Sequence, residues 1–137
     1  MRYTYQNVQR IASESFHGYA SSSGGLVNRF VEIRTYNLRP GTRTQFQRLM
    51  TEAALPLLKR WHIDVVAFGP SPHDEDSYYL LRAYTSLEDR QQSEDRFYGS
   101  AEWREGPRES ILALIDSYAE AVLEMDEVTL QGLRRSL

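Results

Sequence analysis

The sequence predicts an α+β fold, a ferredoxin-like βαββαβ domain with a four-stranded antiparallel sheet. The hydrophobic pattern changes along the chain in the order strand, helix, strand, strand, helix, strand, which is the split βαβ order. A short polar segment between the second and third strands predicts a hairpin. With 137 residues, of which 41% are hydrophobic, the chain is long enough to bury one core.

The first strand and the first helix lie before residue 62. The segment "RFVEIRTY" at 29–36 alternates as a strand does, and a Pro-Gly pair then supplies a turn. Thr42 is followed three residues later by Gln45, a capping-box pattern that predicts the start of a helix. Pro56 is expected to kink this helix or to split its last turn. The apolar stripe of the helix comprises Phe46, Leu49, Met50, Ala53, Leu57 and Trp61.

The second and third strands form the predicted hairpin. Residues 63–70, "IDVVAFGP", are rich in β-branched and aromatic residues and end in a Gly-Pro pair. Residues 71–77 form a polar loop, and residues 78–85, "YYLLRAYT", alternate as the first strand does. We therefore expect an antiparallel pair here.

The rest of the domain carries a helix, a shorter helix and the last strand. Ser86 stands three residues before Asp89, which predicts a helix N-terminus, and the helix is expected over 86–103. A Gly-Pro pair interrupts the chain before a short helix expected over 108–116. The alternating segment "SYAEAVLEM" at 117–125 is the predicted fourth strand. In this topology the first and third strands are central neighbours, and the fourth lies beside the first.

The chain is expected to divide into three parts. Residues 1–26 are polar and end in the linker-like "SSSGG", so they are predicted to form an N-terminal extension or arm. A docking or organelle-targeting segment and a flexible extension are both open for this arm, and the second is favoured. Residues 27–126 hold the folded domain, and residues 127–137 are expected to form a C-terminal tail.

Alternation gives each strand two faces of different character. One face is apolar and includes Val31 and Ile33, and we expect the helices to cover it. The other face mixes aromatic and charged residues, and it is expected to lie away from the helices, with Tyr36 and Tyr84 on it. This mixed face comprises Phe30, Glu32, Arg34, Tyr36, Tyr78, Leu80, Arg82, Tyr84, Tyr118, Glu120, Val122 and Glu124.

The mixed face is the main indication of a partner. So many aromatic residues on one face would form an exposed interaction surface, which a second copy of the chain could cover, so a homodimer is expected. Charges in such an interface are costly to dehydrate unless they pair. Two interpretations stay open for Glu32, Arg34 and Arg82: they pair within the interface, which is favoured, or they line a pocket and hold a polar group of a ligand.

Composition excludes several classes of function. A net charge of -3 provides no basic surface for nucleic acid, so nucleic-acid binding is not expected. The chain has no cysteine, and hence no disulfide, thiol nucleophile or cysteine-ligated metal site. No apolar run is long enough for a membrane helix, and no signal-peptide pattern opens the chain, so we expect a cytoplasmic protein without membrane insertion. All but one of the sixteen basic residues are arginines, which favour planar anions and aromatic rings.

The histidines and acidic clusters do not predict a metal site or a cofactor. His62 ends the first predicted helix, where an imidazolium interacts favourably with the helix dipole. The run "HDED" at 73–76 resembles a metal cluster, but four consecutive loop residues cannot all face one ion. The P-loop, dinucleotide and serine-nucleophile motifs are missing from the sequence. We therefore expect neither metal nor cofactor, and any catalysis would have to use carboxyl groups, His62 or tyrosines.

Three segments together resemble one protein family. "VEIRTYNLRPGTRTQF" is similar to the opening of NIPSNAP proteins, "AYTSLEDR" resembles their central strand-to-helix junction, and "SAEWRE" resembles their tryptophan segment. The resemblance implies a dimeric α/β barrel in which two ferredoxin-like subunits close their sheets together. It assigns no catalytic residue. The positions that match the family pattern are Glu32, Arg34, Tyr36, Tyr84, Arg90 and Trp103.

Two functions stay open. The superfamily that the resemblance implies includes cofactor-independent monooxygenases and isomerases, so a homodimer that binds or transforms a small aromatic or acyl metabolite is the first expectation. A non-catalytic homodimeric interaction or scaffold module is the alternative. Tyr98 and Trp103 are candidates to rim a pocket and to stack a flat ligand. The candidate pocket residues are Glu32, Arg34, Tyr36, Arg82, Tyr84, Arg90, Tyr98, Trp103 and Glu120.

Overall fold

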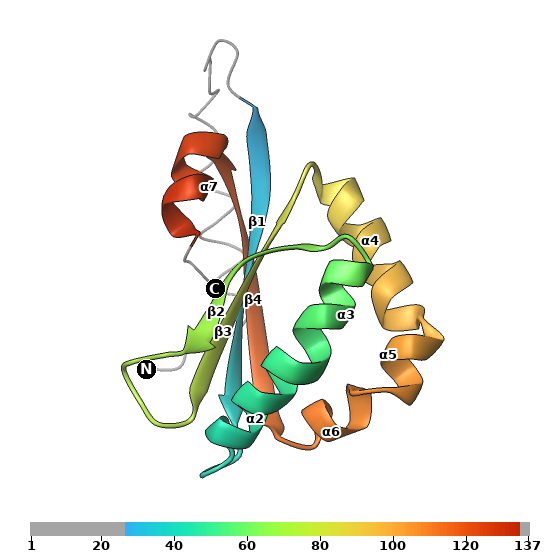
Figure 1. Ribbon diagram of the computed structural model, residues 1–137. Coiled ribbons are helices and arrows are strands. Elements are labelled where there is room, and N and C mark those ends of the chain that lie inside the picture. The colour runs from blue at the N-terminus through green and yellow to red at the C-terminus, as the bar shows by residue number, and fades with distance from the viewer. Residues whose placement is uncertain (1–26, 135–137) are drawn as a thin grey trace.

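A four-stranded antiparallel sheet forms the centre of the molecule, with helices α2 to α6 on one side and α7 on the other (Figure 1). Figure 1 shows the computed structural model, which describes residues 27–134; the predicted N-terminal arm and residues 135–137 lie outside this range. Among the described residues, no helix has the length and apolar character needed to cross a membrane.

The strands and helices follow the predicted order. The strand order across the sheet is β2-β3-β1-β4, so the predicted central pair and the place of the fourth strand are confirmed. The strands are β1 (Asn28–Leu38), β2 (Asp64–Pro70), β3 (Ser77–Tyr84) and β4 (Ile115–Asp126). The helices are α2 (Arg43–Leu49), the π-helical η1 (Met50–Ala54), α3 (Leu55–Arg60), α4 (Leu87–Gly99), α5 (Ala101–Glu105), α6 (Arg108–Leu112) and α7 (Glu127–Leu133).

The first predicted helix is continuous in direction but changes its winding in the middle. The π-helical turn η1 directly precedes the turn that contains Pro56. Proline has no N–H to donate and its ring crowds the carbonyl four residues before it, so a wider turn relieves both problems. The predicted capping box does not form, because the Thr42 hydroxyl donates to the carbonyl of Arg39 at 2.7 Å and caps no backbone N–H of α2.

The second predicted helix is capped as expected but is split into two. The Ser86 hydroxyl accepts a hydrogen bond from the backbone N–H of Asp89 at 2.9 Å, which confirms the predicted N-terminus of α4. Ser100 then caps a new helix, α5, by accepting from the N–H of Trp103 at 3.2 Å. Between α5 and α6 the chain approaches itself closely at Gly106, where an added Cβ would lie 2.3 Å from the carbonyl oxygen of Glu102.

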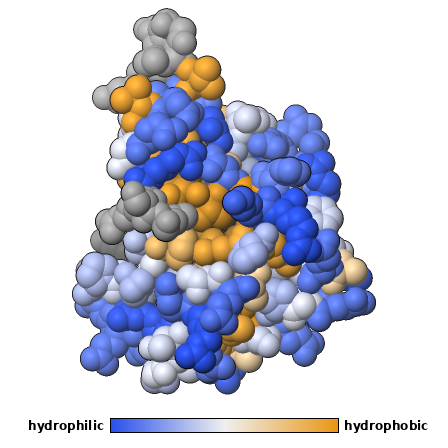
Figure 2. Space-filling model, in the orientation of Figure 1, coloured by the Kyte–Doolittle hydropathy of each residue, from blue (hydrophilic) through white to orange (hydrophobic). Residues whose placement is uncertain are grey.

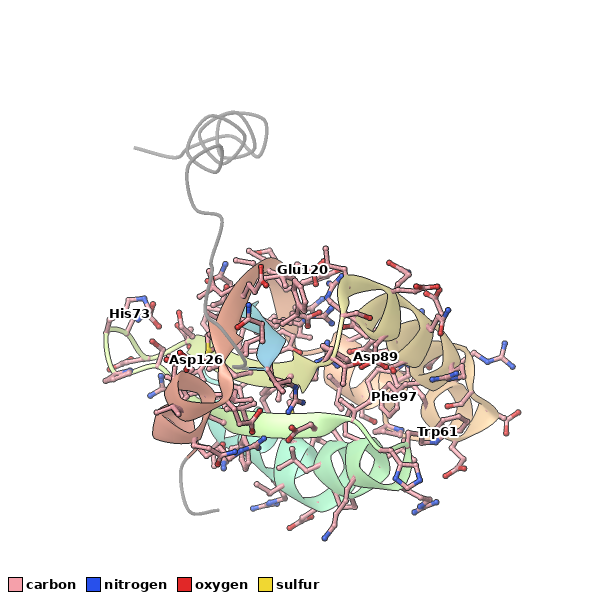
Figure 3. The ribbon with its side chains drawn as sticks, turned by 90° about the horizontal axis from the view of Figure 1, so that it is seen from above. Trp61, His73, Asp89, Phe97, Glu120 and Asp126 are labelled. Carbon is pink, nitrogen blue, oxygen red and sulfur yellow. The ribbon has the colours of Figure 1, made fainter. Side chains whose placement is uncertain are left out.

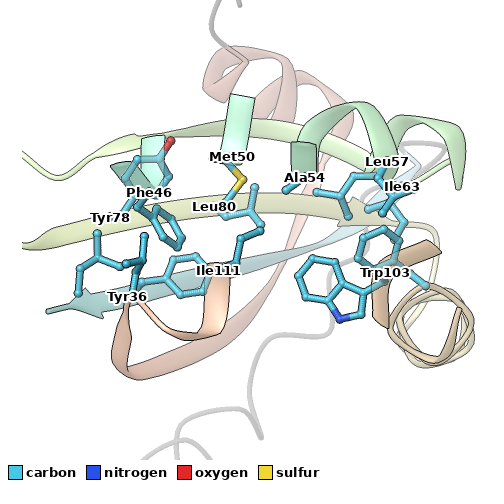
Figure 4. Packing of buried hydrophobic residues seen from close by; sticks show 14 of the residues in the cluster. Tyr36, Phe46, Met50, Ala54, Leu57, Ile63, Tyr78, Leu80, Trp103 and Ile111 are labelled. Carbon is cyan, nitrogen blue, oxygen red and sulfur yellow. The ribbon is translucent and has the colours of Figure 1, made fainter. Parts of the chain in front are cut away.

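The assignment of the two sheet faces from sequence was wrong. Tyr36 and Tyr84 belong to the main hydrophobic core and face the helices, not away from them. Tyr36 packs against Phe46 of α2 with ring centroids 5.3 Å apart (Figure 4). Arg82 lies two residues before Tyr84 on β3, opposite Glu32, so these two charged residues point the same way as the tyrosines. The mixed aromatic and charged face is therefore the one that α2 to α6 cover.

The opposite face carries small and β-branched residues, and α7 covers one end of it. Leu130 of α7 is fully buried against Val31, Val66 and Ala83. Asp64 holds the end of this helix, because it accepts two hydrogen bonds from Arg134, at 2.8 and 2.7 Å. Residues 127–133, which were expected to belong to a C-terminal tail, thus form a packed helix.

The remainder of this second face, here called the open face, is only partly covered within the described part of the chain. Its most exposed large residue is Leu123, at 46%. Figure 2 shows hydrophobic residues gathered in the middle of one face of the molecule, between mainly hydrophilic surfaces. The open face comprises Ile33, Thr35, Tyr79, Leu81, Ala119, Ala121 and Leu123.

Candidate functional site

A buried ion pair lies on the helix-facing side of the sheet. Glu32 on β1 and Arg82 on β3 are directly opposite in the strand register, and both side chains have no solvent exposure. The Arg82 guanidinium donates to Oε1 of Glu32 at 2.5 Å. Two fully dehydrated charges are tolerated only where their geometry and further hydrogen bonds compensate the loss of water.

Two more arginines complete the surroundings of Glu32. Arg90 of α4 donates from Nε to Oε2 of Glu32 at 2.7 Å, and Nε of Arg34 lies 3.3 Å from Oε1. One carboxylate is thus shared by three guanidinium groups from two strands and a helix. This arrangement joins α4 to the centre of the sheet.

A second carboxyl group, Glu94 of α4, lies against the same arginines. Its Oε1 is 3.4 Å from Nη2 of Arg34, and its Oε2 is 3.4 Å from Nε of Arg90. Burial raises the pKa of Glu94, and a hydrogen bond shared with Glu32 raises it further, to about 7. Burial alone would also raise the pKa of Glu32, but the hydrogen bond from Glu94 and the guanidinium groups of Arg82 and Arg34 lower it to about 2. A proton held by this pair of carboxyl groups therefore resides on Glu94, while Glu32 is ionised.

Glu120 on the edge strand β4 closes the cluster towards solvent. Its Oε2 accepts from Nη2 of Arg34 at 2.8 Å and lies 3.2 Å from Nη2 of Arg90. The Glu120 side chain is 39% exposed, whereas those of Arg34 and Arg90 are mostly buried. Figure 3 shows Glu120 on β4 on the side of α4.

A cavity of about 510 Å³ opens beside this cluster, between β1 and β4 on one side and α4, α5 and α6 on the other. Its volume lies within the range of about 300–1,000 Å³ that is typical of small-molecule sites. Its walls combine charged groups with aromatic rings. The lining residues are Arg34, Arg90, Gln91, Glu94, Asp95, Tyr98, Trp103, Arg108, Leu112, Tyr118 and Glu120.

Aromatic rings hold the guanidinium groups in place and form the apolar part of the cavity wall. The Tyr98 hydroxyl accepts from Arg34 at 3.1 Å and from Arg82 at 2.8 Å. The Arg34 guanidinium carbon also lies 5.1 Å from the ring centroid of Tyr118, a cation–π distance. Trp103 packs edge-on against Tyr98, with ring centroids 5.3 Å apart.

The structure brings together most, but not all, of the residues that the sequence indicated. Arg34, Arg90, Tyr98, Trp103 and Glu120 line the cavity. Glu32 and Arg82 do not line the cavity themselves, but Glu32 contacts Arg34 and Arg90, and Arg82 donates to the hydroxyl of Tyr98. By contrast, Tyr36 and Tyr84 belong to the hydrophobic core and do not line the cavity.

Six lining residues were not among the predicted site residues, and three of them contribute charged or aromatic groups that matter for the site. Glu94 lies one helical turn after Arg90 on α4, and this i,i+4 spacing was the available signal for it. Tyr118 was grouped on the same strand face as Glu120, but it was not assigned to a site. Arg108 comes from the first turn of α6, and no sequence pattern connects it with the sheet.

Three carboxyl groups of the site lie close enough together to suggest a cation site, but arginine side chains already pair with them. Oxygen atoms of Glu32, Glu94 and Glu120 lie within 4.8 Å of one another. The guanidinium groups of Arg34 and Arg90 lie against all three, so they supply the positive charge that an ion would bring. The donor set fits arginine pairing better than it fits a metal.

The acidic loop at 73–76 has a structural role. Asp74 accepts from the backbone N–H of Asp76 at 2.8 Å and from the Ser77 hydroxyl at 2.7 Å, which closes the turn of the β2–β3 hairpin. His73 lies 2.9 Å from Asp74. It stands far from Glu120 and the cavity (Figure 3).

The comparison with protein families gives one match. The family described as NIPSNAP matches residues 31–126, which span more than half of the chain and all four strands in whole or in part. No curated protein matches the sequence.

A comparison with solved structures also finds NIPSNAP family proteins. A NIPSNAP family protein of unknown function from Agrobacterium tumefaciens aligns with a TM-score of 0.66 at 21% identity, covering 72% of this chain and 88% of the other. An uncharacterized NIPSNAP-like domain protein from Burkholderia xenovorans aligns with a TM-score of 0.65 at 22% identity, covering 69% and 83%. A proposed antibiotic biosynthesis monooxygenase from Nitrosomonas europaea has a TM-score of 0.53 at 12% identity, covering 69% and 95%. At these identities the similarity shows a common fold.

Proposed function

The chain belongs to the NIPSNAP family, and we propose that it binds and transforms a small aromatic or acyl metabolite in the cavity between the sheet and helices α4 to α6. One observation carries this proposal. A carboxyl group with a pKa near 7, that of Glu94, lines a cavity of ligand size beside Arg34 and Arg90. Groups that titrate near neutral pH and face a cavity are characteristic of acid–base sites.

The reaction that fits this arrangement is proton transfer next to a carbonyl group. Ionised Glu94 would remove a proton from the carbon beside the carbonyl, and the negative charge that develops on the carbonyl oxygen would be stabilised by Arg34 and Arg90. The return of the same proton to a different carbon completes an isomerisation with no other reactant. A cofactor-independent oxygenation would use the same first step, with dioxygen as co-reactant. The fold shared with the Nitrosomonas europaea protein is compatible with the second reaction.

A ligand screen followed by an exchange assay tests this proposal. Thermal-shift measurements with aromatic and acyl metabolites should identify ligands whose stabilising effect falls in Tyr118→Ala, which truncates an exposed cavity wall. Leu87→Ala, an exposed residue outside the cavity, is the matched control. For each ligand found, exchange of its carbon-bound proton with D₂O should be accelerated by the wild type and not by Glu94→Gln. Binding without exchange would exclude the catalytic part of the proposal.

The alternative function is a non-catalytic homodimeric module. It is supported by the internal pairing of the cluster, in which Glu32 and Arg82 need no ligand to compensate their burial. In both functions we propose a homodimer, but through the open face rather than the mixed face expected from sequence. Leu123 and its apolar neighbours on the open face support this, because a partly exposed apolar sheet face is a typical interaction surface.

A further inference from the structure

We propose that Glu120 occupies the anion subsite of the cavity, and that the carboxylate of a flat aromatic acid displaces it from Arg34 and Arg90. This inference rests on the proposed function, because it requires a ligand in the cavity. It adds the chemical class of that ligand and the atoms that it contacts.

The geometry around Glu120 is that of a bound carboxylate. A single oxygen, Oε2, lies 2.8 Å from Nη2 of Arg34 and 3.2 Å from Nη2 of Arg90, so it bridges two guanidinium groups at the cavity wall. A ligand carboxylate placed there would make the same two charge-assisted contacts. Arginine is well suited to such planar anions.

Glu120 is also the member of the cluster that can leave. Its side chain is the most exposed of the three carboxyl groups, and it projects from β4, an edge strand of the sheet. Glu32 and Glu94 are held between buried arginines, so their displacement would leave dehydrated charges unpaired. Rotation of Glu120 towards water keeps its own carboxylate hydrated, and the ligand carboxylate replaces it beside the two arginines.

The two arginines keep their positions when Glu120 leaves. Arg34 remains tied to Glu32 at 3.3 Å and to the Tyr98 hydroxyl at 3.1 Å. Arg90 remains bound to Oε2 of Glu32 at 2.7 Å. The subsite is therefore pre-organised, which lowers the entropic cost of ligand binding.

The charge balance requires an anion in that place. Without Glu120, the three buried guanidinium groups of Arg34, Arg82 and Arg90 face Glu32 and Glu94 alone. Because the pKa of Glu94 is about 7, this carboxyl group is about half protonated at neutral pH. The cluster then carries excess positive charge, which a single ligand carboxylate compensates.

The rest of the cavity favours a flat ring on that carboxylate. The Tyr118 ring lies over Arg34 on one side, and Tyr98 and Trp103 form the wall on the other. A ring attached to the carboxylate would lie among these aromatic side chains, where stacked and edge-on contacts add to affinity. Glu94 and Asp95 also line the cavity and disfavour a second negative charge on the ligand.

Titration calorimetry with benzoate tests the inference, with acetate as the ligand that has no ring. Glu120→Gln removes the competing charge and should tighten benzoate binding about two- to fivefold, the size of a partly exposed ion pair. Glu124→Gln is the matched control, since Glu124 lies on the same face of β4 but outside the cavity, and it should bind benzoate as the wild type does. Acetate should bind more weakly than benzoate to all three proteins.

Other outcomes separate this inference from the proposed function. Unchanged or weaker benzoate binding by Glu120→Gln would overturn the displacement of Glu120. Absence of benzoate binding, together with thermal shifts from uncharged ligands that depend on Tyr118, would overturn the anion subsite and leave the proposed function intact. If no ligand of either kind shifts the melting temperature of the wild type, both fail.

Discussion

Glu32 and Glu94 have carboxyl oxygens within 4.8 Å of each other among three mostly buried guanidinium groups, and the pKa values of the two carboxyl groups move in opposite directions. The pair comes from two different elements, strand β1 and helix α4. The proton on Glu94 therefore joins the sheet to the helix that forms one wall of the cavity. Its loss should affect both the stability of the fold and the charge that a ligand meets.

The pair predicts an unusual dependence of stability on pH. The pKa of Glu94 rises on folding from 4.5 to about 7, so between these values the folded protein holds a proton that the unfolded chain has released, and stability falls as pH rises. The pKa of Glu32 falls on folding from 4.5 to about 2, so this residue makes stability rise between about pH 2 and 4.5. Together the two groups should give maximal stability near pH 4.5.

The variant Glu94→Gln should remove the falling part of that curve. The amide can donate to Glu32 as the protonated carboxyl group does, but it does not titrate. Urea unfolding should give similar stability for variant and wild type near pH 5, and a more stable variant at pH 8, by on the order of 1–3 kcal/mol. Glu88→Gln, an exposed position on the same helix, is the control and should follow the wild type at both pH values. Parallel curves for wild type and Glu94→Gln would contradict the protonated state assigned to Glu94.

Removal of one member of the buried ion pair should lower the free energy of unfolding more than removal of both members. Arg82→Met takes away the partner of Glu32 and a hydrogen bond to Tyr98, and it should cost about 3–5 kcal/mol. The double variant Glu32→Met/Arg82→Met leaves Glu94 and Glu120 with Arg34 and Arg90, a balanced set of charges. Its free energy of unfolding should lie closer to that of the wild type. A double variant that loses the sum of both single losses would show that the pair has no coupling.

If the protein is a homodimer, a single substitution in the interface should halve its mass in solution. Leu123→Glu places a charge on the open face, on the edge strand β4, and this charge should dissociate the dimer because it cannot be dehydrated without a partner. Light scattering after size-exclusion chromatography should give a dimer for the wild type and a monomer for the variant. Leu87→Glu, which adds the same charge at an exposed leucine of α4, should remain dimeric. A monomeric wild type would exclude the dimer.

Helix α7 should contribute to the stability of the domain. Leu130 is fully buried between α7 and the sheet, so Leu130→Ala should lower the free energy of unfolding by about 2–5 kcal/mol. Val128→Ala, an exposed position on the same helix, should change it little. Denaturant unfolding of the two variants gives the comparison, and equal stability would mean that α7 is not part of the cooperative unit.

Much of the fold could be predicted from local patterns, whereas the face of the sheet under the helices could not. Strand 29–36 was evident from alternation, because that signal depends on neighbouring residues alone, and its place in the sheet followed from the predicted topology. Alternation separates Val31 from Glu32 but does not say which of them faces the helices. The charges on one face were interpreted as a sign of exposure or of an interface. In the structure Glu32 pairs with Arg82 of the neighbouring strand and also with Arg90 of α4, and the contact with the helix can be recognised only once the elements are packed.

The same reasoning explains which residues of the site could be predicted from the sequence. Glu32, Arg34 and Arg82 could be grouped from sequence, since strand register brings them together. Glu94 could not, because its place depends on which side of α4 packs on the sheet, and this helix has few apolar residues to indicate it. Arg108 depends on the turn at Gly106, a tertiary feature without a local signal.

The position of α7 limits the contacts that any partner can make with the sheet. The helix lies over the end of the sheet that contains Val31 and Ala83, and within residues 27–134 the other end, around Thr35 and Ala119, is exposed. A protein that packs on this face must lie off the centre of the sheet, with its area of contact limited by a helix of seven residues. The length of α7 therefore sets how much of the sheet face a partner can contact. A longer helix would reduce this contact area, and a shorter one would let the partner pack closer to the middle of the strands.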